Sequence, residues 1–398
     1  MKVHRMVVAS AFAVTAVLGS LSFTVEAKQQ TGVQPMREHE SLVKELPETL
    51  KRFKFENGFN FEYPDAVRGI YVTGHSAGGA KFSQLVDLTE KSDLNSMVID
   101  FKDDWGNLTY IPDESSPYNK IGKPYIKNPD AMLRTLEEKK IYPIARIVVF
   151  KDTQLANAKT EWSFKKGNEV WTNGRGESFV NPFLKEVWEH NVGIAIEAAK
   201  MGFQEIQFDY VRFPEGFETR DKTLTYSMGE YEKLEMDNIQ KRVQAVTDFV
   251  AYAKEQLEPY NVKVSVDIFG YTATLPEAPG IGQNFTKISQ NIDVISSMIY
   301  PSHWTSYFGI SKPDLEPYKL VSEYAKVENS ILAKLEQPPV SRPWLQDFTA
   351  SWLGSGNYKR YGKAEVEAQI KALQDQGIKE FLLWNAGNSY TKNVDYTP

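Results

Sequence analysis

The sequence predicts an α/β protein, built as a single (β/α)8 TIM barrel with long strand-to-helix loops. Short apolar, β-branched segments alternate with amphipathic helical segments, which is typical of parallel strands joined by helical crossovers. The connections are also unequal. About 26, 31 and 22 residues follow the second, third and fourth strands, whereas about two or three residues lead from helix back to strand. Long loops on one face indicate a closed barrel rather than an open doubly wound sheet.

The N-terminal residues 1–27 are interpreted as a signal peptide. A short basic segment precedes an apolar, uncharged run from Met6 to Phe23, and small residues around Ala27 suit a signal peptidase. The mature chain is therefore expected to begin near Lys28, to be secreted or associated with the cell envelope, and to leave the membrane. The run is marginal for a membrane span, so an uncleaved N-terminal membrane anchor is the alternative. Residues 28–68 are predicted to form an N-terminal extension or linker.

The barrel domain, residues 69–398, begins with the first of eight predicted strands. Each is short and rich in β-branched and aromatic residues. The strands are Gly69–Thr73, Ser96–Phe101, Tyr142–Phe150, Glu205–Arg212, Lys263–Phe269, Val294–Tyr300, Pro343–Phe348 and Glu380–Asn385. The helices between them are 80–91, 128–139, 182–201, 235–257, 281–291, 314–335 and 364–376. After the eighth strand little chain remains, so the last helix is expected to be short or missing.

Composition excludes several classes of site. The chain has no cysteine, which excludes disulfides, thiolate catalysis and cysteine-ligated zinc. A disulfide-free exported chain fits a bacterial secretory route. Formal net charge is −6 without a basic stripe, so a nucleic-acid partner is not expected. No His-x-x-x-His pair and no phosphate-binding glycine loop is found, so no metal and no cofactor are predicted.

Acidic residues stand late in three apolar strands. Asp100, Asp209 and Asp267 each follow buried-type residues at the carboxyl end of a predicted strand. A carboxylate there is costly unless it is paired, hydrogen-bonded or facing a pocket. One such residue could be purely structural, but three at one barrel mouth favour a functional site.

Two carboxyl groups in different surroundings are what glycosidic cleavage requires. Asp209 is predicted to be the nucleophile or base, kept ionised by a cation such as Arg212. Asp267 stands among apolar residues that should raise its pKa, which suits the general acid. Asp100 and Asp347 are alternatives for either role, and retention or inversion of the anomeric centre stays open.

Other polar and aromatic residues at the strand ends are predicted to bind the substrate, a polysaccharide or oligosaccharide. Aromatic faces pack against sugar rings as they pack against each other, although any single ring could equally belong to the core. The predicted substrate-binding residues are Asp100, Lys102, Lys151, Tyr210, Arg212, Tyr300, His303, Trp304, Asp347, Trp384 and Asn385.

A second motif suggests different chemistry. Gly74-His75-Ser76-Ala77-Gly78 follows a strand and precedes a helix, as in the G-x-S-x-G nucleophile elbow of α/β-hydrolases. It follows the first strand, however, before any strand that could supply an oxyanion loop. We therefore interpret the motif as a glycine-rich loop at the barrel mouth, with a serine esterase using Ser76 as the alternative function.

The strand-end motifs resemble those of a family of bacterial TIM-barrel proteins of unknown function that are classed with the glycoside hydrolases. The resemblance runs from about Gly69 to Tyr390. The segments that carry it are Val98-Ile99-Asp100-Phe101-Lys102-Asp103, Ile144-Ala145-Arg146-Ile147-Val148-Val149-Phe150-Lys151-Asp152, Phe208-Asp209-Tyr210-Val211-Arg212-Phe213-Pro214, Tyr300-Pro301-Ser302-His303-Trp304, Arg342-Pro343-Trp344-Leu345-Gln346-Asp347-Phe348 and Leu383-Trp384-Asn385-Ala386.

The resemblance implies a distantly α-amylase-like barrel. In that broader group an aspartate at the end of strand four is the nucleophile, and this position matches Asp209. The acid of the amylase type is a glutamate after strand five, where this chain has Asp267, a departure from the pattern. The leading hypothesis is an exported glycoside hydrolase acting on an extracellular or cell-wall polysaccharide. A non-catalytic carbohydrate-binding barrel is the alternative from another class.

Overall fold

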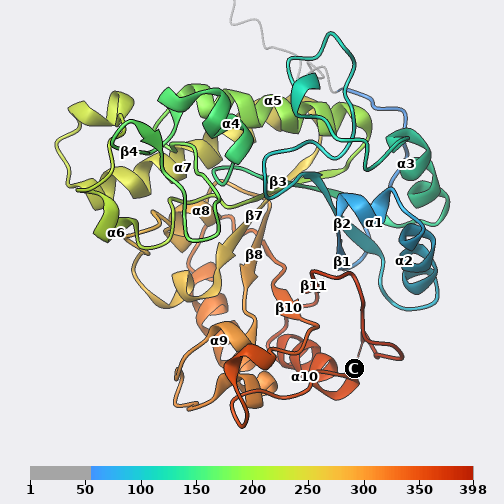
Figure 1. The fold of residues 1–398 in the computed structure, drawn as a ribbon. Helices are drawn as coiled ribbons and strands as arrows, with labels where there is room; N and C mark the ends of the chain where they lie inside the picture. Colours follow the sequence, from blue (N-terminus) through green and yellow to red (C-terminus); the bar gives the residue numbers. More distant parts are fainter. Residues whose placement is uncertain (1–54, 398) are drawn as a thin grey trace, which may run out of the picture. The chain divides into compact units, whose positions relative to one another are not determined.

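A computed structural model describes residues 55–397; the predicted signal peptide and residues 28–54 lie outside the described residues. Within the described part of the chain, eight parallel strands close into a barrel, which confirms the predicted fold (Figure 1). The barrel strands are β1 (Arg68–Val72), β2 (Ser96–Lys102), β3 (Tyr142–Val148), β6 (Glu205–Asp209), β7 (Lys263–Phe269), β8 (Val294–Met298), β10 (Trp344–Gln346) and β11 (Phe381–Trp384).

The ring of strands closes in chain order. Each strand pairs in parallel with the next, and β11 pairs with β1. The junction between β8 and β10 is short, with Trp344 opposite Met298. The two-residue strand β9 (Val340–Ser341) lengthens this junction by pairing with the first half of β8. In the described chain, seven helices separate the eight barrel strands, at the positions that the sequence predicts.

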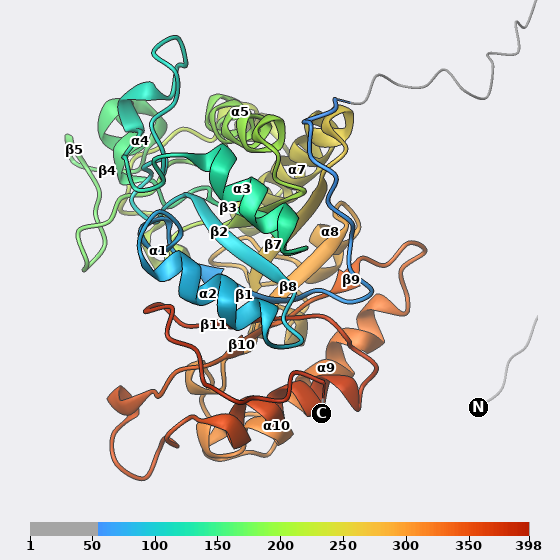
Figure 2. The ribbon, with the colours of Figure 1, turned by 90° about the vertical axis from the view of Figure 1, so that its right-hand side faces the viewer.

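Helices cover the outside of the strands, as two views at right angles show (Figures 1 and 2). Their apolar faces pack on the barrel, so most aliphatic strand residues lie in a continuous core between the strands and the helices. The covering helices are α2 (Lys81–Glu90), α3 (Pro129–Glu138), α5 (Lys185–Met201), α7 (Asn238–Leu257), α8 (Phe285–Ser289), α9 (Pro317–Leu332) and α10 (Lys363–Gln374).

The fourth barrel strand shows where sequence pattern and structure differ. The apolar run predicts a strand to Arg212, but β6 ends at Asp209. Tyr210 has a φ of 53°, in the left-handed region, and this breaks the extended backbone. The turn places Asp209 at the last ladder position, at the barrel mouth. Beyond β11 no helix follows within the described residues, as expected.

The strand-to-helix loops carry additional small elements. The loop after β3 holds the helix α4 (Thr153–Ala158) and the hairpin of β4 (Lys165–Lys166) and β5 (Glu169–Val170), and the loop after β6 holds α6 (Phe217–Arg220). The helix-to-strand turns at the other end of the barrel are short, and one of them depends on a glycine. Gly202, with a φ of 126°, ends α5, and a Cβ there would lie 2.5 Å from the Phe59 ring.

The N-terminal end of the barrel is closed by an ion-pair network. Arg342 is fully buried, and its guanidinium nitrogens lie 2.7 Å from Glu205 and 2.8 Å from Glu380. The same guanidinium donates to the hydroxyl of Tyr63 at 2.8 Å. Residues 55–67, predicted as part of an extension or linker, therefore pack on the barrel. Over residues 55–397, no helix is long and apolar enough to cross a membrane.

Candidate active site

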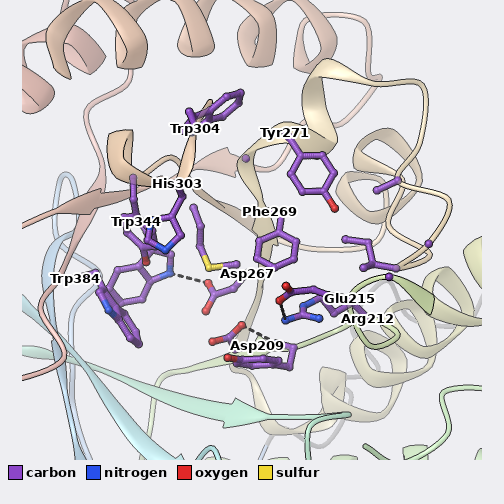
Figure 3. A pocket seen from close by; sticks show the side chains of 18 of the residues that line it. Asp209, Arg212, Glu215, Asp267, Phe269, Tyr271, His303, Trp304, Trp344 and Trp384 are labelled. Atoms are coloured by element: carbon purple, nitrogen blue, oxygen red, sulfur yellow. Dashed lines mark hydrogen bonds and ion pairs between the residues drawn. The ribbon is translucent and has the colours of Figure 1, made fainter. Parts of the chain in front are cut away.

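A cavity of about 850 Å³ opens at the carboxyl ends of the barrel strands. Its floor contains the two predicted catalytic residues, Asp209 and Asp267, and Figure 3 shows both carboxyl groups pointing into it. Six of the predicted substrate-binding residues also line it: Tyr210, Arg212, Tyr300, His303, Trp304 and Trp384.

Strand register makes the two aspartates neighbours. Phe208 of β6 pairs with Val266 of β7, so the next residue along each strand is Asp209 and Asp267. Paired strands lie about 4.8 Å apart, and side chains one step along from a pair leave the sheet on the same side. Phe208 and Val266 face the helices and belong to the core, so both aspartates face the barrel interior.

Asp209 is held in place by a buried arginine. Its Oδ2 accepts hydrogen bonds from Arg146 of β3, at 2.9 Å from Nε and 2.6 Å from Nη2. Its Oδ1 accepts from the backbone N–H of Tyr210 at 2.6 Å. These charge-assisted bonds stabilise the ionised carboxylate and fix its direction. Arg212, the counter-ion predicted from the sequence, is not the partner of Asp209; Arg146 is.

Arg146 connects three aspartates. Besides Asp209, it donates to Asp100 of β2 at 2.7 Å and to Asp104 at 2.9 Å. Tyr71 donates to the other oxygen of Asp100 at 2.6 Å. Burial raises the pKa of Asp100 to about 6, against the opposing charge of Arg146. Burial would also raise the pKa of Asp104, but Arg146 and Lys151 lower it to about 2. Asp100 thus holds the guanidinium of Arg146 in place and does not line the cavity.

Asp267 has the opposite surroundings. It is buried, and its Oδ1 accepts one hydrogen bond, from the indole N–H of Trp344 at 2.8 Å. Burial, together with the nearby negative charge of Asp209, raises the pKa of Asp267 well above its usual range. This agrees with the expectation from its apolar neighbours in β7. A carboxyl group that keeps its proton can donate it to a leaving oxygen.

Aromatic side chains form one wall of the cavity, on the side of Trp344 and Trp384 in Figure 3. Trp384 stacks on Tyr71 with ring centroids 4.0 Å apart, and Trp344 meets Trp384 edge-on at 5.5 Å. Tyr300 lies next to Trp384 at 6.4 Å. Trp344 is therefore both a core residue and a cavity residue, because its indole ring is packed while its N–H holds Asp267.

His303 adds a polar group to this wall. Its Nδ1 lies 3.1 Å from the hydroxyl of Ser302, and that hydroxyl donates to Gln346 at 2.8 Å. Burial lowers the pKa of His303, which favours the neutral ring. With the hydroxyl proton directed to Gln346, the Nδ1 position is assigned the ring proton and Nε2 is left as an acceptor. That nitrogen can accept from a sugar hydroxyl.

The opposite side of the cavity carries charge (Figure 3). The guanidinium of Arg212 lies 4.6 Å from the ring centre of Phe269 and 4.7 Å from that of Tyr210. It also pairs with Glu215 at 3.0 Å. The side chain of Glu215 is 71% exposed, so this pair contributes little to stability. Arg212 is thus a fixed cation of the cavity wall and does not contact Asp209.

Five predicted substrate-binding residues do not line the cavity: Asp100, described above, and Lys102, Lys151, Asp347 and Asn385. Lys102 is fully buried between β2, β3 and α5, where its ammonium pairs with Asp152 at 2.6 Å. Lys151 is also buried and reaches the cavity indirectly, through its ion pair with Asp104. Asp347 accepts from Thr391, and Asn385 donates to the backbone at Asp347 and Ser389. These contacts of Asp347 and Asn385 fasten the C-terminal segment to the barrel.

The G-x-S-x-G segment forms a packed turn. A Cβ on Gly74 would lie 2.5 Å from Thr109, and one on Gly78 would lie 1.7 Å from the carbonyl oxygen of Tyr125. The ring of His75 stacks on Tyr125 at 3.8 Å. Within the described residues, no hydrogen bond joins Ser76 to a histidine. The glycines are explained by close packing, and a Ser–His pair is not assembled.

Arg146 and Glu215 are two of the cavity residues that were not predicted as part of the site. A signal for Arg146 was present, because an arginine in the middle of an apolar strand must find buried carboxylates. Glu215 had no such signal, since it stands in a polar loop whose path the sequence does not specify. Over the described chain, no group of three or more histidine and carboxylate side chains is arranged to hold a metal ion.

Comparisons with known proteins agree with this architecture. A family model described as "Putative glycosyl hydrolase domain" matches residues 69–390. A hypothetical protein from Ruminiclostridium thermocellum is 31% identical over 50% of this chain and 96% of its own, with a TM-score of 0.42. A search of curated proteins gave no match.

Two solved structures show the same fold at low identity. The glycoside hydrolase domain of PgaB (BpsB) from Bordetella bronchiseptica is 15% identical, with 80% of this chain and 94% of that chain covered and a TM-score of 0.55. An alpha-amylase from Lactobacillus plantarum is 13% identical, with 81% and 71% covered and a TM-score of 0.50.

Proposed function

The chain belongs to the glycosyl hydrolase family whose model covers residues 69–390, and we propose that it cleaves O-glycosidic bonds of an extracellular or cell-wall polysaccharide. The observation that supports this most directly is the pair of Asp209 and Asp267. They are neighbours on β6 and β7, and they face one cavity from opposite electrostatic surroundings. Paired carboxyl groups that differ in this way can divide the roles of acid and nucleophile.

Asp267 is assigned as the general acid. Its Oδ1 is held by Trp344, which leaves Oδ2 to carry the proton toward the glycosidic oxygen. Asp209 is assigned as the nucleophile. Its charge is stabilised by Arg146, which donates two hydrogen bonds to Oδ2, and its Oδ1 accepts from the Tyr210 N–H. As the leaving group departs with the proton of Asp267, Asp209 attacks the anomeric carbon and forms a glycosyl-enzyme. A water molecule, deprotonated by the Asp267 carboxylate, then displaces Asp209, which releases the sugar and restores the acid.

The strand register further supports retention of the anomeric configuration. Retaining enzymes have carboxyl groups about 5–5.5 Å apart, whereas inverting enzymes leave about 6.5–9.5 Å for a water molecule. Residues at laterally adjacent positions on paired strands are about 4.8 Å apart at the backbone. Direct attack by Asp209 therefore fits better than attack by an intervening water. Proton NMR of the first-formed product anomer tests this, and an inverted anomer would contradict it.

The assignment is tested by comparing two substitutions on two kinds of substrate. A polysaccharide panel first identifies a polymer from which the protein releases reducing ends. On that polymer, Asp209→Asn and Asp267→Asn are each expected to lower kcat by at least about 10³-fold. On an aryl glycoside of the same sugar with an acidic phenol leaving group, Asp267→Asn is expected to retain most activity, because such a leaving group needs little protonation.

Asp209→Asn is expected to lose activity on both substrates, since both need the nucleophile. If Asp267→Asn remains fully active on the polymer, Asp267 is not the acid. Glu215→Gln is the comparison variant for that result, because Glu215 is a further carboxylate that lines the cavity. If Asp209→Asn keeps wild-type activity on the polymer, the proposed mechanism is wrong.

We also propose that the protein acts outside the cytoplasm. The basic start, the apolar run from Met6 to Phe23 and the small residues near Ala27 support export. Expression of the full chain, fractionation of the cells and N-terminal sequencing test this proposal. A mature N-terminus near Lys28 in the medium or envelope fraction is expected. Full-length protein that remains in the cytoplasm would contradict it.

A further inference from the structure

Trp352 is the most exposed of the large apolar side chains in the described part of the chain, at 65%. It stands in the short helix η8 (Ser351–Leu353), in the loop that follows β10 at the barrel mouth. It does not line the cavity and takes no part in the proposed chemistry. Single exposed apolar residues are common on protein surfaces, so the position and surroundings of Trp352 decide whether it binds a ligand.

The indole ring of Trp352 is held in a fixed position. It stacks on Phe348 with ring centroids 5.9 Å apart and planes inclined by 22°. Its loop is anchored on the neighbouring loop, where Lys359 donates its backbone N–H to Asp314 at 3.0 Å and Lys312 donates to the carbonyl of Gly356 at 2.8 Å. One face of the indole is therefore packed, and the other is available.

The exposed ring is continuous with the aromatic wall of the cavity. Trp352 lies 6.4 Å from His303, and Phe348 lies 6.3 Å from His303 and 5.9 Å from Tyr300. His303 and Tyr300 both line the cavity. The aromatic surface thus runs from the catalytic pair past His303 and out over the rim to Trp352.

We propose that Trp352, supported by Phe348, is an outer sugar-binding platform for a glycan chain that extends beyond the cavity. The proposal rests on the proposed function, because it takes the chain to be held across Asp209 and Asp267. It adds that the polymer is bound at internal units and that affinity increases with chain length. A sugar ring stacks on an aromatic face much as another ring does.

The surroundings of the indole favour a glycan over a protein partner. Trp352 is flanked by small and polar exposed residues: Ser351, Gly354, Ser355, Gly356 and Asn357. A stable protein interface needs a much larger continuous surface. A single aromatic face bordered by hydroxyl and amide groups has the size and chemistry of one sugar ring with its hydroxyls.

Binding measurements with the full chain carrying Asp209→Asn, which blocks turnover, test the platform. The probes are soluble starch, xylan, glycol chitosan and solubilised peptidoglycan in affinity electrophoresis, followed by a trisaccharide of whichever sugar retards the protein. Trp352→Ala is expected to weaken polymer binding by about tenfold, equivalent to about 1.4 kcal/mol. Trp352→Phe is expected to stay within about threefold, because a ring remains.

The trisaccharide should bind to the Trp352→Ala protein as it does to the parent, because it fits within the cavity. Tyr318→Ala is the matched control, since Tyr318 is an exposed aromatic residue on α9 and should leave polymer binding unchanged. Unchanged polymer binding in Trp352→Ala, an equal loss for polymer and trisaccharide, or no retardation by any probe overturns the platform. Trp352-dependent binding without release of reducing ends by the wild type would keep the platform and refute the hydrolase mechanism.

Discussion

The two central aspartates have the same side chain and different surroundings. Asp209 receives two bonds from one guanidinium, whereas Asp267 receives a single neutral bond from Trp344. The negative charge of Asp209 also disfavours ionisation of Asp267, whose hydrogen bond comes from a neutral donor. Burial and the charge of Asp209 therefore hold Asp267 protonated. The proposed division of roles rests on Arg146 being on one side of the pair.

The raised pKa of Asp267 predicts a pH dependence. As an acid, Asp267 is active while protonated, so kcat/KM is expected to fall on the alkaline side as pH rises through its raised pKa. A pH–rate profile on the identified polymer measures this fall. In Asp267→Asn the residual activity on the aryl glycoside should lack that alkaline limb. An alkaline limb that persists unchanged in Asp267→Asn would assign it to another group.

Arg146 is predicted to position the nucleophile through the shape of its side chain as well as its charge. Its planar fork meets Asp100, Asp104 and Asp209 together, which the ammonium of lysine cannot do. Arg146→Lys is expected to lower kcat by about 10²-fold, with a smaller change in KM, because a misdirected nucleophile slows the chemical step.

Steady-state kinetics on the identified polymer measure the split between kcat and KM. Arg134→Lys is the control, since Arg134 pairs with Asp130 on the exposed face of α3 and should leave both constants unchanged. If Arg146→Lys changes KM alone, the arginine binds substrate and does not position Asp209.

At this scale the sequence could identify Asp209 and Asp267 because acids in apolar strands are costly and therefore conspicuous. It could not identify the partner of Asp209. Arg212 is three positions away in sequence, but the left-handed turn at Tyr210 carries it to the other side of the cavity. Arg146 is distant in sequence and is brought close by the pairing of β3 with β6. Lys102 was misplaced for a similar reason, since its side chain points outward to Asp152.

At the scale of elements, periodicity predicted all eight barrel strands and the seven helices between them. The positions agree because each strand is a short apolar run and each helix has an apolar stripe. The two-residue strand β9 and the β4–β5 hairpin were not predicted, since two residues carry no period. The hydrophobic pattern also does not predict the register between strands, and the register of β6 with β7 is what makes Asp209 and Asp267 neighbours.

The turn between β1 and α2 carries its own prediction. Because a Cβ on Gly78 would lie 1.7 Å from the carbonyl oxygen of Tyr125, Gly78→Ala must displace backbone. We expect it to lower the free energy of unfolding by about 1–3 kcal/mol. Ser76→Ala should change neither stability nor hydrolysis of esters or glycans. Urea denaturation and parallel assays measure both, and loss of an esterase activity in Ser76→Ala would restore the serine mechanism.

In the whole barrel, the cavity and the buried ion-pair network lie at opposite ends of the strands. The carboxyl ends of the strands carry the cavity, the aspartate pair and the loops that vary in length. The amino ends carry the fully buried Arg342, which joins Glu205 of β6 to Glu380 beside β11 across the barrel. In barrels of this kind, buried polar groups at that end serve stability, while those at the other end serve chemistry.

This separation predicts that Arg342 affects stability, whereas Arg146 affects kcat. Arg342→Met leaves Glu205 and Glu380 buried without their cation, so the free energy of unfolding should fall by about 3–5 kcal/mol. Because the network lies at the far end of the strands from the cavity, kcat, KM and the pH profile of the folded variant should equal those of the wild type. Urea denaturation measures the first effect, and kinetics below the unfolding transition measure the second.

A triple variant separates charge burial from packing. Arg342→Met combined with Glu205→Leu and Glu380→Leu removes every charge of the network while keeping similar volume, and its stability should return to within about 1–2 kcal/mol of the wild type. If instead Arg342→Met alone loses activity while keeping full stability, the N-terminal network is coupled to the cavity, and the division of the barrel into a stability end and a chemical end does not hold.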